Sequence, residues 1–389
     1  MGRILIATLP LAGHLYPALA IASKLSRRGH TVAWATPPAG LSSRLLADGQ
    51  VFPLPLLAEQ PPDLDRTQAR GFESVRTFFE HYALPMARQT FEALREAVTV
   101  FQPDAWLVDH QMVGAAIAAR ASDRPWATLA TSSASIHRVH PTMDAWVADA
   151  LGQLQTELLP GRPPVERPDF SPHAVIVPSV EALIGERRAR FEAAYHFVGP
   201  LRDEARADSP FPWSWLQPDR RKILVSLGTV NRDLGSRFFE MICDAMRLLP
   251  DVQAILVAPE TVAGGAPDNV LVCQQVPQIS LLARVDGVLC HAGHNTVCEA
   301  LAQGVPLIVS PIRHDQPLIA EQVLLAGAGL FLRHGKATAS ATSALIRQLL
   351  EDPGPRSRAA ELSVAMRSAS GADGAADVIE RLLTPGERP

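Results

Sequence analysis

One short segment of the sequence combines residue types that bind phosphate groups. Residues 290–302, CHAGHNTVCEALA, follow an apolar run and contain a glycine turn, after which helical spacing starts near Asn295 and Thr296. The first amides of such a helix have no partner within it and lie at the positive end of its dipole, so a diphosphate can dock there. His291 can donate a further hydrogen bond, and Glu299 suits a sugar hydroxyl. The segment predicts a nucleotide site, and a capped helix with a structural histidine is the alternative.

A carboxylate and an amide stand side by side at Asp315 and Gln316, beyond the next apolar run, which ends at Ser310. Together they supply the acceptors and donors that neighbouring sugar hydroxyls need. A solvated turn is the more frequent meaning of such a dipeptide. This one follows the next strand of the same predicted sheet, so it shares the carboxyl edge of that sheet with His291.

The elements that position these residues alternate between short strands and helices. Residues 3–8 and 31–36 form two apolar runs with helical spacing over 17–28 between them, which is the pattern of a parallel βαβ unit. After a polar, proline-rich stretch at 201–221 the alternation begins again. The other predicted elements are helices over 72–101, 113–120 and 296–303, and strands over 105–108, 126–130, 222–227, 254–257, 270–273, 287–290 and 306–309. The pattern predicts two α/β domains that face each other, with ligands in a cleft at the carboxyl ends of the strands.

The composition excludes several classes of protein. The chain has 389 residues, 47% of them hydrophobic and 20% charged, which is typical of globular domains rather than disordered or repetitive chains. The formal net charge of −4 and the lack of a basic run argue against a nucleic-acid partner. The four cysteines show no CxxC spacing, so they indicate buried thiols in a reducing compartment, with no metal or other cofactor; they are Cys243, Cys273, Cys290 and Cys298.

The apolar N-terminal stretch at residues 1–22 is interpreted as a strand and a helix rather than a secretory signal, because Pro10, His14 and Pro17 interrupt it. No segment reaches the roughly 18 consecutive apolar residues that a membrane span requires. We therefore expect a soluble, cytoplasmic protein, present as a monomer or a homodimer.

Residues 275–329 resemble the donor-binding signature of the family 1 nucleotide-sugar glycosyltransferases. The N-terminal half resembles the family too, through Gly13-His14, Pro17 and the string LSRRGH at 25–30, so the resemblance covers most of the chain. The string DQPLIAEQV is more similar to bacterial carotenoid and polyketide glycosyltransferases than to plant ones. The matching strings of the donor signature are VPQ at 276–278, HAGHNT at 291–296, EAL at 299–301, GVPLIVSP at 304–311 and DQ at 315–316.

The resemblance implies the GT-B fold, in which two facing Rossmann-like domains bind the acceptor and the donor. It implies an acceptor domain over 1–200, a linker over 201–221, a donor domain over 222–374, and a tail or helix over 375–389 that could pack back on the first domain. It also implies donor contacts. The base and ribose would contact Val276, Gln278 and Glu299, and the sugar would contact Asp315 and Gln316. The diphosphate would contact Ser226, Gly228, Thr229, His291, Asn295 and Thr296. Gly13 and Gly293 are further candidate donor-binding residues, and His294 either reaches the diphosphate or lines the cleft.

The resemblance further implies that His14 is a general base and that Asp109 orients it. A histidine near neutral pH can take the proton of an acceptor hydroxyl while the oxygen attacks the anomeric carbon, and a carboxylate on the far ring nitrogen fixes its tautomer. Attack opposite the departing nucleotide inverts the anomeric centre. Asp104 is the competing carboxylate, but it precedes its strand and so lies at the wrong edge of the sheet. A polar residue at a helix start is the alternative role of His14.

Three positions depart from the family pattern. Plant members carry a tryptophan where this chain has Gln275, so stacking on the base must be supplied differently, and a UDP- or a TDP-sugar remains open. His294 replaces a glycine of the motif, and Ile319 replaces an asparagine.

The acceptor is expected to be an apolar small molecule such as a polyketide, a macrolide or a carotenoid. The expectation rests on aromatic residues in the predicted helix over 72–101, although most of these residues suit a core equally well. The candidate acceptor residues are Phe78, Phe79, Tyr82, Ser132 and Ser133.

Other chemistries receive less support from the sequence. Asp63 and Asp65 have the DxD form of a divalent-metal site, but they lie in a polar loop after two prolines, so we expect no metal. The string GAG at 327–329 lacks the third glycine of a dinucleotide fingerprint, and TSSAS at 131–135 lacks a hydrolase elbow. A nucleotide-sugar 2-epimerase of the same fold and a non-catalytic nucleotide-sugar-binding partner of another transferase are the alternative functions.

Overall fold

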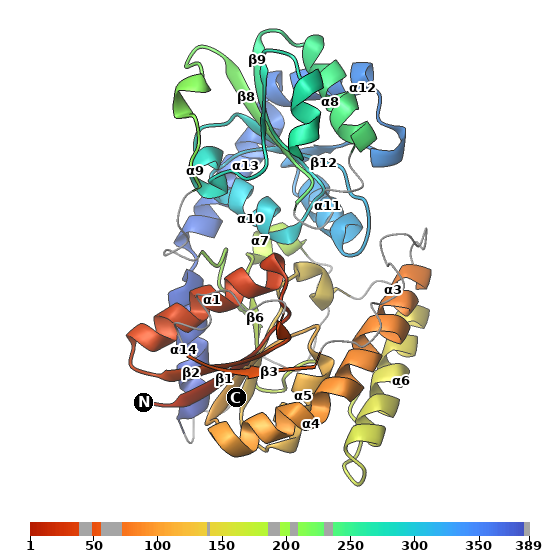
Figure 1. Cartoon of the computed structure of the whole chain (residues 1–389), viewed down its shortest axis with the longest axis vertical. Helices are drawn as coiled ribbons and strands as arrows, with labels where there is room; N and C mark the ends of the chain where they lie inside the picture. Colours follow the sequence, from red (N-terminus) through yellow and green to blue (C-terminus); the bar gives the residue numbers. More distant parts are fainter. Residues whose placement is uncertain are drawn as a thin grey trace. The chain divides into compact units, whose positions relative to one another are not determined.

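Each half of the chain is built on one parallel β-sheet covered by helices (Figure 1). The structure is a computed structural model that describes residues 1–38, 49–55, 72–137, 141–185, 195–202, 209–228 and 236–384. The contacts divide the chain into two units. Unit 1 comprises Met1–Pro178, Glu186–Glu204 and Ala369–Pro389, and unit 2 comprises Ser179–Gly185 and Ala205–Ser368.

The sheet of unit 1 has seven parallel strands in the order β3-β2-β1-β4-β5-β6-β7. Its strands read as continuous apolar runs because helices bury both faces. The strand order reverses between β1 and β4, which is where open α/β sheets bind ligands at the carboxyl edge. The strands are β1 (Arg3–Ala7), β2 (Thr31–Thr36), β3 (Gln50–Pro53), β4 (Ala105–Asp109), β5 (Trp126–Leu129), β6 (Ala174–Val177) and β7 (Tyr195–Phe197).

The two faces of this sheet carry different helices (Figure 1). Ile4 and Ile6 of β1 belong to a buried cluster with α1 and α14, whereas Leu5 and Ala7 belong to a cluster with α4 and α5. This alternation is the two-residue period of a strand. The helical elements of unit 1 are α1 (Ala12–Arg27), α3 (Phe72–Phe78), the π-helical turn η2 (Phe79–Ala83), α4 (Leu84–Phe101), α5 (Val113–Ala121), the 3₁₀ turn η3 (Ser133–Ile136), α6 (Pro141–Leu158) and α14 (Gly371–Leu383).

Unit 2 has a sheet of six parallel strands in the order β10-β9-β8-β11-β12-β13, which reverses between β8 and β11. The strands are β8 (Arg221–Ser226), β9 (Val252–Val257), β10 (Val270–Cys273), β11 (Gly287–Cys290), β12 (Leu307–Val309) and β13 (Gly329–Phe331). The α-helices are α7 (Glu181–Ile184), α8 (Ser236–Arg247), α9 (Gln278–Leu282), α10 (His294–Ala302), α11 (Gln316–Leu325), α12 (Ala339–Glu351) and α13 (Pro353–Ser368), and the 3₁₀ turns are η5 (Trp213–Trp215), η7 (Glu260–Gly265) and η8 (His334–Lys336).

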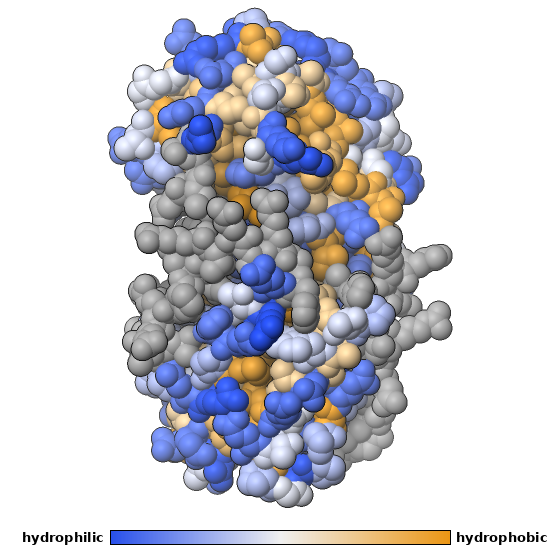
Figure 2. Space-filling view, turned by 90° about the vertical axis from the view of Figure 1, so that its right-hand side faces the viewer, coloured by the Kyte–Doolittle hydropathy of each residue, from blue (hydrophilic) through white to orange (hydrophobic). Residues whose placement is uncertain are grey.

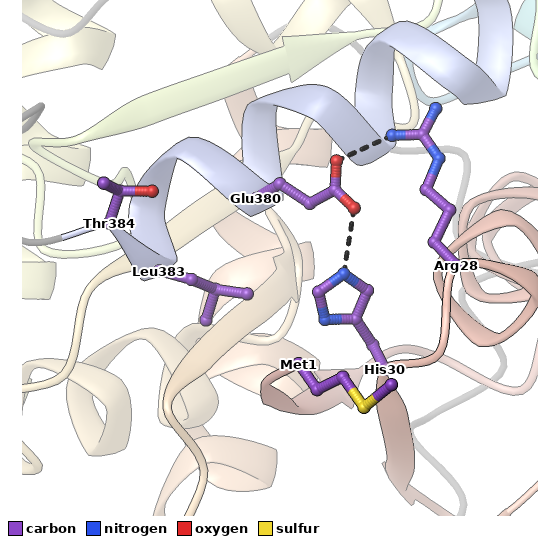
Figure 3. A pocket seen from close by; sticks show the side chains of 6 residues that line it. All are labelled: Met1, Arg28, His30, Glu380, Leu383 and Thr384. Atoms are coloured by element: carbon purple, nitrogen blue, oxygen red, sulfur yellow. Dashed lines mark hydrogen bonds and ion pairs between the residues drawn. The ribbon is translucent and has the colours of Figure 1, made fainter.

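The C-terminal helix α14 packs on the N-terminal elements of unit 1 (Figure 3). The Arg28 guanidinium lies 2.6 Å from the carboxylate of Asp377 and 2.8 Å from that of Glu380. His30 accepts a hydrogen bond from the backbone N–H of Gly2 at 3.1 Å, and its other ring nitrogen lies 2.9 Å from Glu380. Such partly exposed ion pairs contribute modestly, so the apolar face of α14, which includes the fully buried Ile379, supplies most of the attachment.

The structure differs from the sequence-based expectations at several elements. The helix α1 begins at Ala12 rather than Pro17, so Pro17 lies inside it; a proline near the start of a helix removes few hydrogen bonds. The π-helical turn η2 interrupts the helix predicted over 72–101. Several elements were not predicted, and short strands carry little pattern of their own. They are the strands β3, β6, β7 and β13 and the helices α6, α7, α8, α9, α11, α12 and α13.

The described surface mixes polar and apolar residues (Figure 2). Large apolar side chains such as Leu325 and Val364 are exposed singly, which is ordinary for a globular protein. Within the described ranges, no helix combines the length and the apolar character needed to cross a membrane.

Candidate active site

Three neighbouring strands of unit 1 bring polar side chains to one edge of its sheet. His14 lies in the first turn of α1, directly after β1; Asp109 is the last residue of β4; and Thr131 follows the end of β5. Since β1, β4 and β5 are adjacent and parallel, their carboxyl ends share one edge. Asp104 precedes β4 at the opposite edge, where its carboxylate accepts a hydrogen bond from the backbone N–H of Arg3 at 2.8 Å.

His14 and Asp109 form a close pair at this edge. His14 Nδ1 lies 2.7 Å from Asp109 Oδ2, and the side chain of Asp109 has no exposed surface. Asp109 Oδ1 accepts a second hydrogen bond, from the backbone N–H of Gln111 at 2.9 Å. Burial raises the pKa of Asp109, but the charge and hydrogen bond of His14, the charge of His110 and the Gln111 amide outweigh burial and hold the pKa below its usual value. Asp109 is therefore a carboxylate that accepts from His14 Nδ1–H.

In this pair, the other ring nitrogen of His14, Nε2, is the atom that can accept a proton. With Nδ1–H directed at the carboxylate, the neutral imidazole carries its lone pair on Nε2. A proton taken up at Nε2 yields an imidazolium beside a buried anion, which is the arrangement of a general base with an orienting carboxylate. The adjacent Gly13 is exposed, and a Cβ added there would meet no atom within 4 Å.

Two further side chains at this edge were not among the predicted site residues. Thr131 Oγ1 lies 3.0 Å from His14 Nδ1 and 3.3 Å from His110 Nδ1. His110 Nδ1 lies 3.5 Å from Asp109 Oδ1, and the two imidazole rings stack with centroids 6.2 Å apart and planes 23° from parallel. The signal in the sequence was their position: His110 adjoins the predicted aspartate, and Thr131 begins the loop after the neighbouring strand.

The predicted acceptor residues fall into two groups. Three aromatic residues stand at the π-helical turn: Phe78 immediately precedes it, and Phe79 and Tyr82 lie within it. The ring centroid of Phe78 is 5.4 Å from that of Phe79 and 5.6 Å from that of Tyr82. All three are partly exposed and pack against the buried cluster of α4 and α5, so they belong in part to the core. Burial and the charge of Asp109 raise the pKa of Tyr82. Their contact with an acceptor stays a prediction.

The two predicted acceptor serines lie in the loop after β5, and both are nearly or fully buried. Ser132 Oγ accepts a hydrogen bond from the backbone N–H of Ala134 at 3.4 Å and so caps the 3₁₀ turn η3. Ser133, inside that turn, has no exposed surface. These positions give both serines a structural role, and their contact with an acceptor also stays a prediction.

In unit 2, the predicted phosphate-binding turn encloses His291. A Cβ added to Gly228 would lie 2.6 Å from His291 Cε1, and one added to Gly293 would lie 2.5 Å from His291 Nε2. Gly228 also has a φ of +77°, in the region that favours glycine. The loop after β8 and the loop after β11 thus approach the ring from two sides, and only glycine leaves room for it.

The described residues around His291 leave one of its ring nitrogens without a partner. Burial lowers the pKa of His291; the charge of Asp315 and a hydrogen bond with the Ser226 backbone oppose this shift, and the charge of Arg313 adds to it. Its Nδ1 is buried and has no hydrogen-bond partner among the described residues. Such an orphaned polar atom at the start of a helix indicates a missing ligand.

The helix α10 begins at His294, immediately after the N-cap residue Gly293, and no acidic residue occupies its first turn. The positive end of the helix dipole at these first amides is therefore not neutralised by an acidic side chain of the first turn and can attract an anion. Asn295 and Thr296 lie in the same turn. His294 is buried, with Nε2 3.7 Å from Cys298 Sγ in the next turn, so it packs into the unit.

The remaining predicted donor residues lie along the carboxyl edge of the same sheet. Gln278 Nε2 donates to Glu299 Oε2 at 2.5 Å, which unites two residues expected at the base and ribose. Gln316 Oε1 accepts hydrogen bonds from the backbone N–H groups of Ile312 and Arg313 at 2.8 and 3.0 Å, so this oxygen orders the loop before α11. Of the others, Ser226 ends β8, Val276 precedes α9, Asp315 is the N-cap of α11, and Thr229 lies outside the described residues.

No cluster of three or more metal-ligating side chains occurs among the residues that the structure describes. The DxD string at Asp63 and Asp65 lies outside them.

Comparisons with known proteins agree with this architecture. Residues 252–382 match the family model of the erythromycin biosynthesis protein CIII-like C-terminal domain. The demethyllactenocin mycarosyltransferase of Streptomyces fradiae is 27% identical over 410 residues, which cover 99% of this chain and 87% of that protein. The 4′-demethylrebeccamycin synthase of Lentzea aerocolonigenes is 26% identical over 430 residues, covering 98% of this chain and 99% of that protein.

A solved structure shares the fold along nearly the whole chain. The spinosyn rhamnosyltransferase complexed with thymidine diphosphate superimposes with a TM-score of 0.76 at 20% identity, covering 97% of this chain and 100% of that one. At this identity the likeness establishes the two-sheet architecture alone.

Proposed function

The chain is a family 1 glycosyltransferase of the GT-B fold, and from that premise we propose that it transfers a hexose or deoxyhexose from a nucleotide-diphosphate sugar to a hydroxyl of an apolar natural product. The observation that carries the proposal is the His14–Asp109 pair, with Nδ1 and Oδ2 2.7 Å apart and the carboxylate fully buried. An acceptor hydroxyl is a poor nucleophile at neutral pH and needs a base. His14 Nε2 is the atom that takes its proton.

The proposed reaction is a single displacement. The acceptor oxygen attacks the anomeric carbon while its proton moves to His14 Nε2, and the bond from that carbon to the diphosphate oxygen breaks. Asp109 keeps the second proton of the imidazolium on Nδ1 and stabilises its positive charge. Attack from the face opposite the leaving group inverts the anomeric configuration.

The leaving diphosphate would be held by unit 2. The first amides of α10 and the orphaned Nδ1 of His291 would supply donors for it, and Gly228 and Gly293 leave room for the His291 ring. Gln278 and Glu299 would contact the nucleoside, and Asp315 and Gln316 the sugar. With these donors facing the departing charge, the proposed mechanism needs no divalent metal.

The classes of donor and acceptor are inferred from relatives. The matched rhamnosyltransferase binds thymidine diphosphate, so TDP-sugars are tested first and UDP-sugars beside them. The mycarosyltransferase and the demethylrebeccamycin synthase are named for natural products, and the aromatic residues around the π-helical turn of unit 1 suit such an apolar molecule.

Calorimetry with TDP and UDP tests the donor site. His291→Ala should weaken binding of the preferred diphosphate by about 1–3 kcal/mol, the range for a hydrogen bond to a charged group, whereas Asp315→Ala should change it little because the proposed contact of Asp315 is to the sugar. Both variants should bind the intact nucleotide-sugar more weakly. Binding of neither diphosphate to the unaltered protein would overturn the proposal.

Turnover assays separate transfer from its alternatives. With a panel of nucleotide-sugars and apolar alcohols, the product should be a glycoside of inverted configuration, formed equally with and without chelator. Conversion of the nucleotide-sugar to an epimer in the absence of acceptor would identify an epimerase instead. Loss of turnover with chelator would refute the metal-independent mechanism and return attention to Asp63 and Asp65.

A further inference from the structure

Two imidazoles converge on one carboxylate at the carboxyl edge of unit 1. His14 Nδ1 lies 2.7 Å from Asp109 Oδ2, and His110 Nδ1 lies 3.5 Å from Asp109 Oδ1. Thr131 Oγ1 stands between the rings, 3.0 Å from Nδ1 of His14 and 3.3 Å from Nδ1 of His110. The same nitrogen of each ring is thus directed at the same two partners.

The hydrogens available in this cluster are few. Asp109 is buried, and its Oδ1 also accepts from the Gln111 amide at 2.9 Å. Thr131, which is 4% exposed, has one hydroxyl proton to donate. When His110 is neutral, that proton can be donated to His110 Nδ1, and the Thr131 oxygen then turns a lone pair towards His14 Nδ1–H. When His110 is protonated, its own Nδ1–H must point at Thr131 Oγ1 and at Asp109 Oδ1, which are the hydroxyl that His14 also contacts and the second oxygen of the carboxylate that His14 contacts through Oδ2.

We propose that His110 is a positioning residue whose protonation competes with that of His14, because both rings depend on the carboxylate of Asp109 and the hydroxyl of Thr131. A neutral His110 orients the threonine hydroxyl so that it supports a protonated His14. A protonated His110 draws on the same carboxylate and places a second positive charge beside the first ring. His14 is then a weaker base.

Charge interaction between the rings gives the size of the effect. For unit charges separated by the 6.2 Å between ring centroids, Coulomb's law gives a shift of roughly 0.5–2 pH units between effective dielectric constants of about 80 and about 20. The coupling is reciprocal, so the ring that binds its proton at higher pH lowers the titration midpoint of the other. Tyr82 of the π-helical turn also interacts with the charge of Asp109; burial and that charge raise the pKa of Tyr82, so it stays neutral in the physiological range.

The coupling is tested without any substrate. Two-dimensional NMR of protein labelled with ¹⁵N in its histidines gives the titration midpoint of each ring in the unaltered chain, in His14→Asn and in His110→Asn. Asparagine places an amide nitrogen close to the position of Nδ1 but does not titrate. Replacing the ring with the higher midpoint should raise the midpoint of the remaining ring by roughly 0.5–2 pH units. Unchanged midpoints in both variants would overturn the inference.

Substitution of Thr131 separates the bridging hydroxyl from direct charge repulsion. Thr131→Val keeps the shape of the side chain and removes the hydroxyl, so it should alter the ¹⁵N shifts of both Nδ1 atoms, whereas Thr131→Ser should restore them. His30, which lies at the opposite end of β1 beside α14, serves as an internal reference whose ¹⁵N shifts at a fixed pH should be the same in every variant. Thr131→Val spectra that match those of the unaltered chain at both rings would show that the hydroxyl does not connect them.

The consequence for catalysis rests on the proposed function. His110→Asn should retain at least a tenth of kcat at high pH, because the base and its carboxylate persist, but should change the shape of the acidic limb of kcat/KM from a two-proton to a one-proton dependence. His110→Phe, which stacks but cannot accept the Thr131 proton, should lower kcat further than His110→Asn, whose amide oxygen can accept it. An acidic limb of identical shape in the unaltered enzyme and His110→Asn would refute the catalytic role. Coupled NMR titrations in a protein with no transferase activity would instead refute the proposed function and leave the coupling standing.

Discussion

Replacing Asp109 by asparagine tests the tautomer of His14. The substitution preserves the shape of the side chain, so the packing of a residue with no exposed surface is kept. The backbone N–H of Gln111 requires an acceptor at the position of Oδ1, 2.9 Å away, which directs the asparagine carbonyl there and its NH₂ group towards His14 Nδ1. Facing a donor, Nδ1 must become the acceptor, and the ring proton moves to Nε2. His14 then has no lone pair at the atom that receives the acceptor's proton.

The expected loss follows from the hydrogen bonds that change. Returning the proton to Nδ1, or turning the asparagine amide over, leaves two buried donors facing each other, at a cost of about 1–3 kcal/mol. The transition state also loses a charge-assisted hydrogen bond between imidazolium and carboxylate, about 1.5–3 kcal/mol. Together these amount to roughly 2.5–6 kcal/mol, which corresponds to a fall in kcat of about 10²–10⁴.

The assay is product formation at saturating nucleotide-sugar and acceptor, followed by chromatography. His14→Ala should fall by a similar factor, and the double variant should be little worse than either single variant, since the two residues act as one unit. Binding of the nucleoside diphosphate and the melting temperature are the controls and should change little. A kcat within threefold of the unaltered enzyme, or losses that multiply in the double variant, would refute the reasoning.

Three further predictions concern unit 2. Gly293→Ala should displace the His291 ring and abolish measurable diphosphate binding in calorimetry. The control Gly335→Ala, where an added Cβ meets nothing within 4 Å, should bind diphosphate normally, and equal affinity of the two variants would contradict the close approach of Gly293 to His291. Asn269→Ala should lower the free energy of unfolding by about 1–3 kcal/mol in urea titration, because the Asn269 amide donates to the backbone carbonyls of Met246, Leu249 and Val252, which run from the end of α8 to the start of β9. A smaller loss would mean that water replaces the amide. Burial raises the pKa of Cys298 to about 12, so an alkylating reagent at about pH 8 should leave this thiol unmodified in the native protein and modify it in urea-unfolded protein, as read by peptide mass spectrometry. Rapid alkylation of the native protein would show that α10 opens.

The sequence predicts the strand ends that carry the site because buried parallel strands are continuous apolar runs. The direction of β4 alone distinguishes Asp109 from Asp104, since only the residue at its carboxyl end can lie beside the loop after β1. The tightness of the pair, and the burial that makes it a strong interaction, depend on packing by α4 and α5, which no local pattern specifies.

The parts that escaped prediction depend on contacts between segments distant in sequence. Thr131 is 117 residues from His14 and 21 residues from His110 in the sequence, so the sequence spacing does not predict that their side chains are in contact. The π-helical turn η2 escaped for a different reason: an extra residue within a helix leaves the apolar pattern on both sides intact. The enclosure of His291 by two glycines from separate loops could be suspected from the motifs, but only the structure shows that both approach one ring.

The path of the chain through its two units constrains how hybrid enzymes can be built from this protein. A single crossover in the proline-rich stretch between the units would take α14 from the second parent, although this helix packs on β1, α1 and β4 of the first. Arg28 and Glu380 would then come from different parents, and the cluster around Ile379 would combine side chains that were never selected together. A hybrid that exchanges donor specificity should instead replace residues 209–368 as an internal cassette, accompanied by the short α7 segment Ser179–Gly185, and return to the first parent before α14 begins.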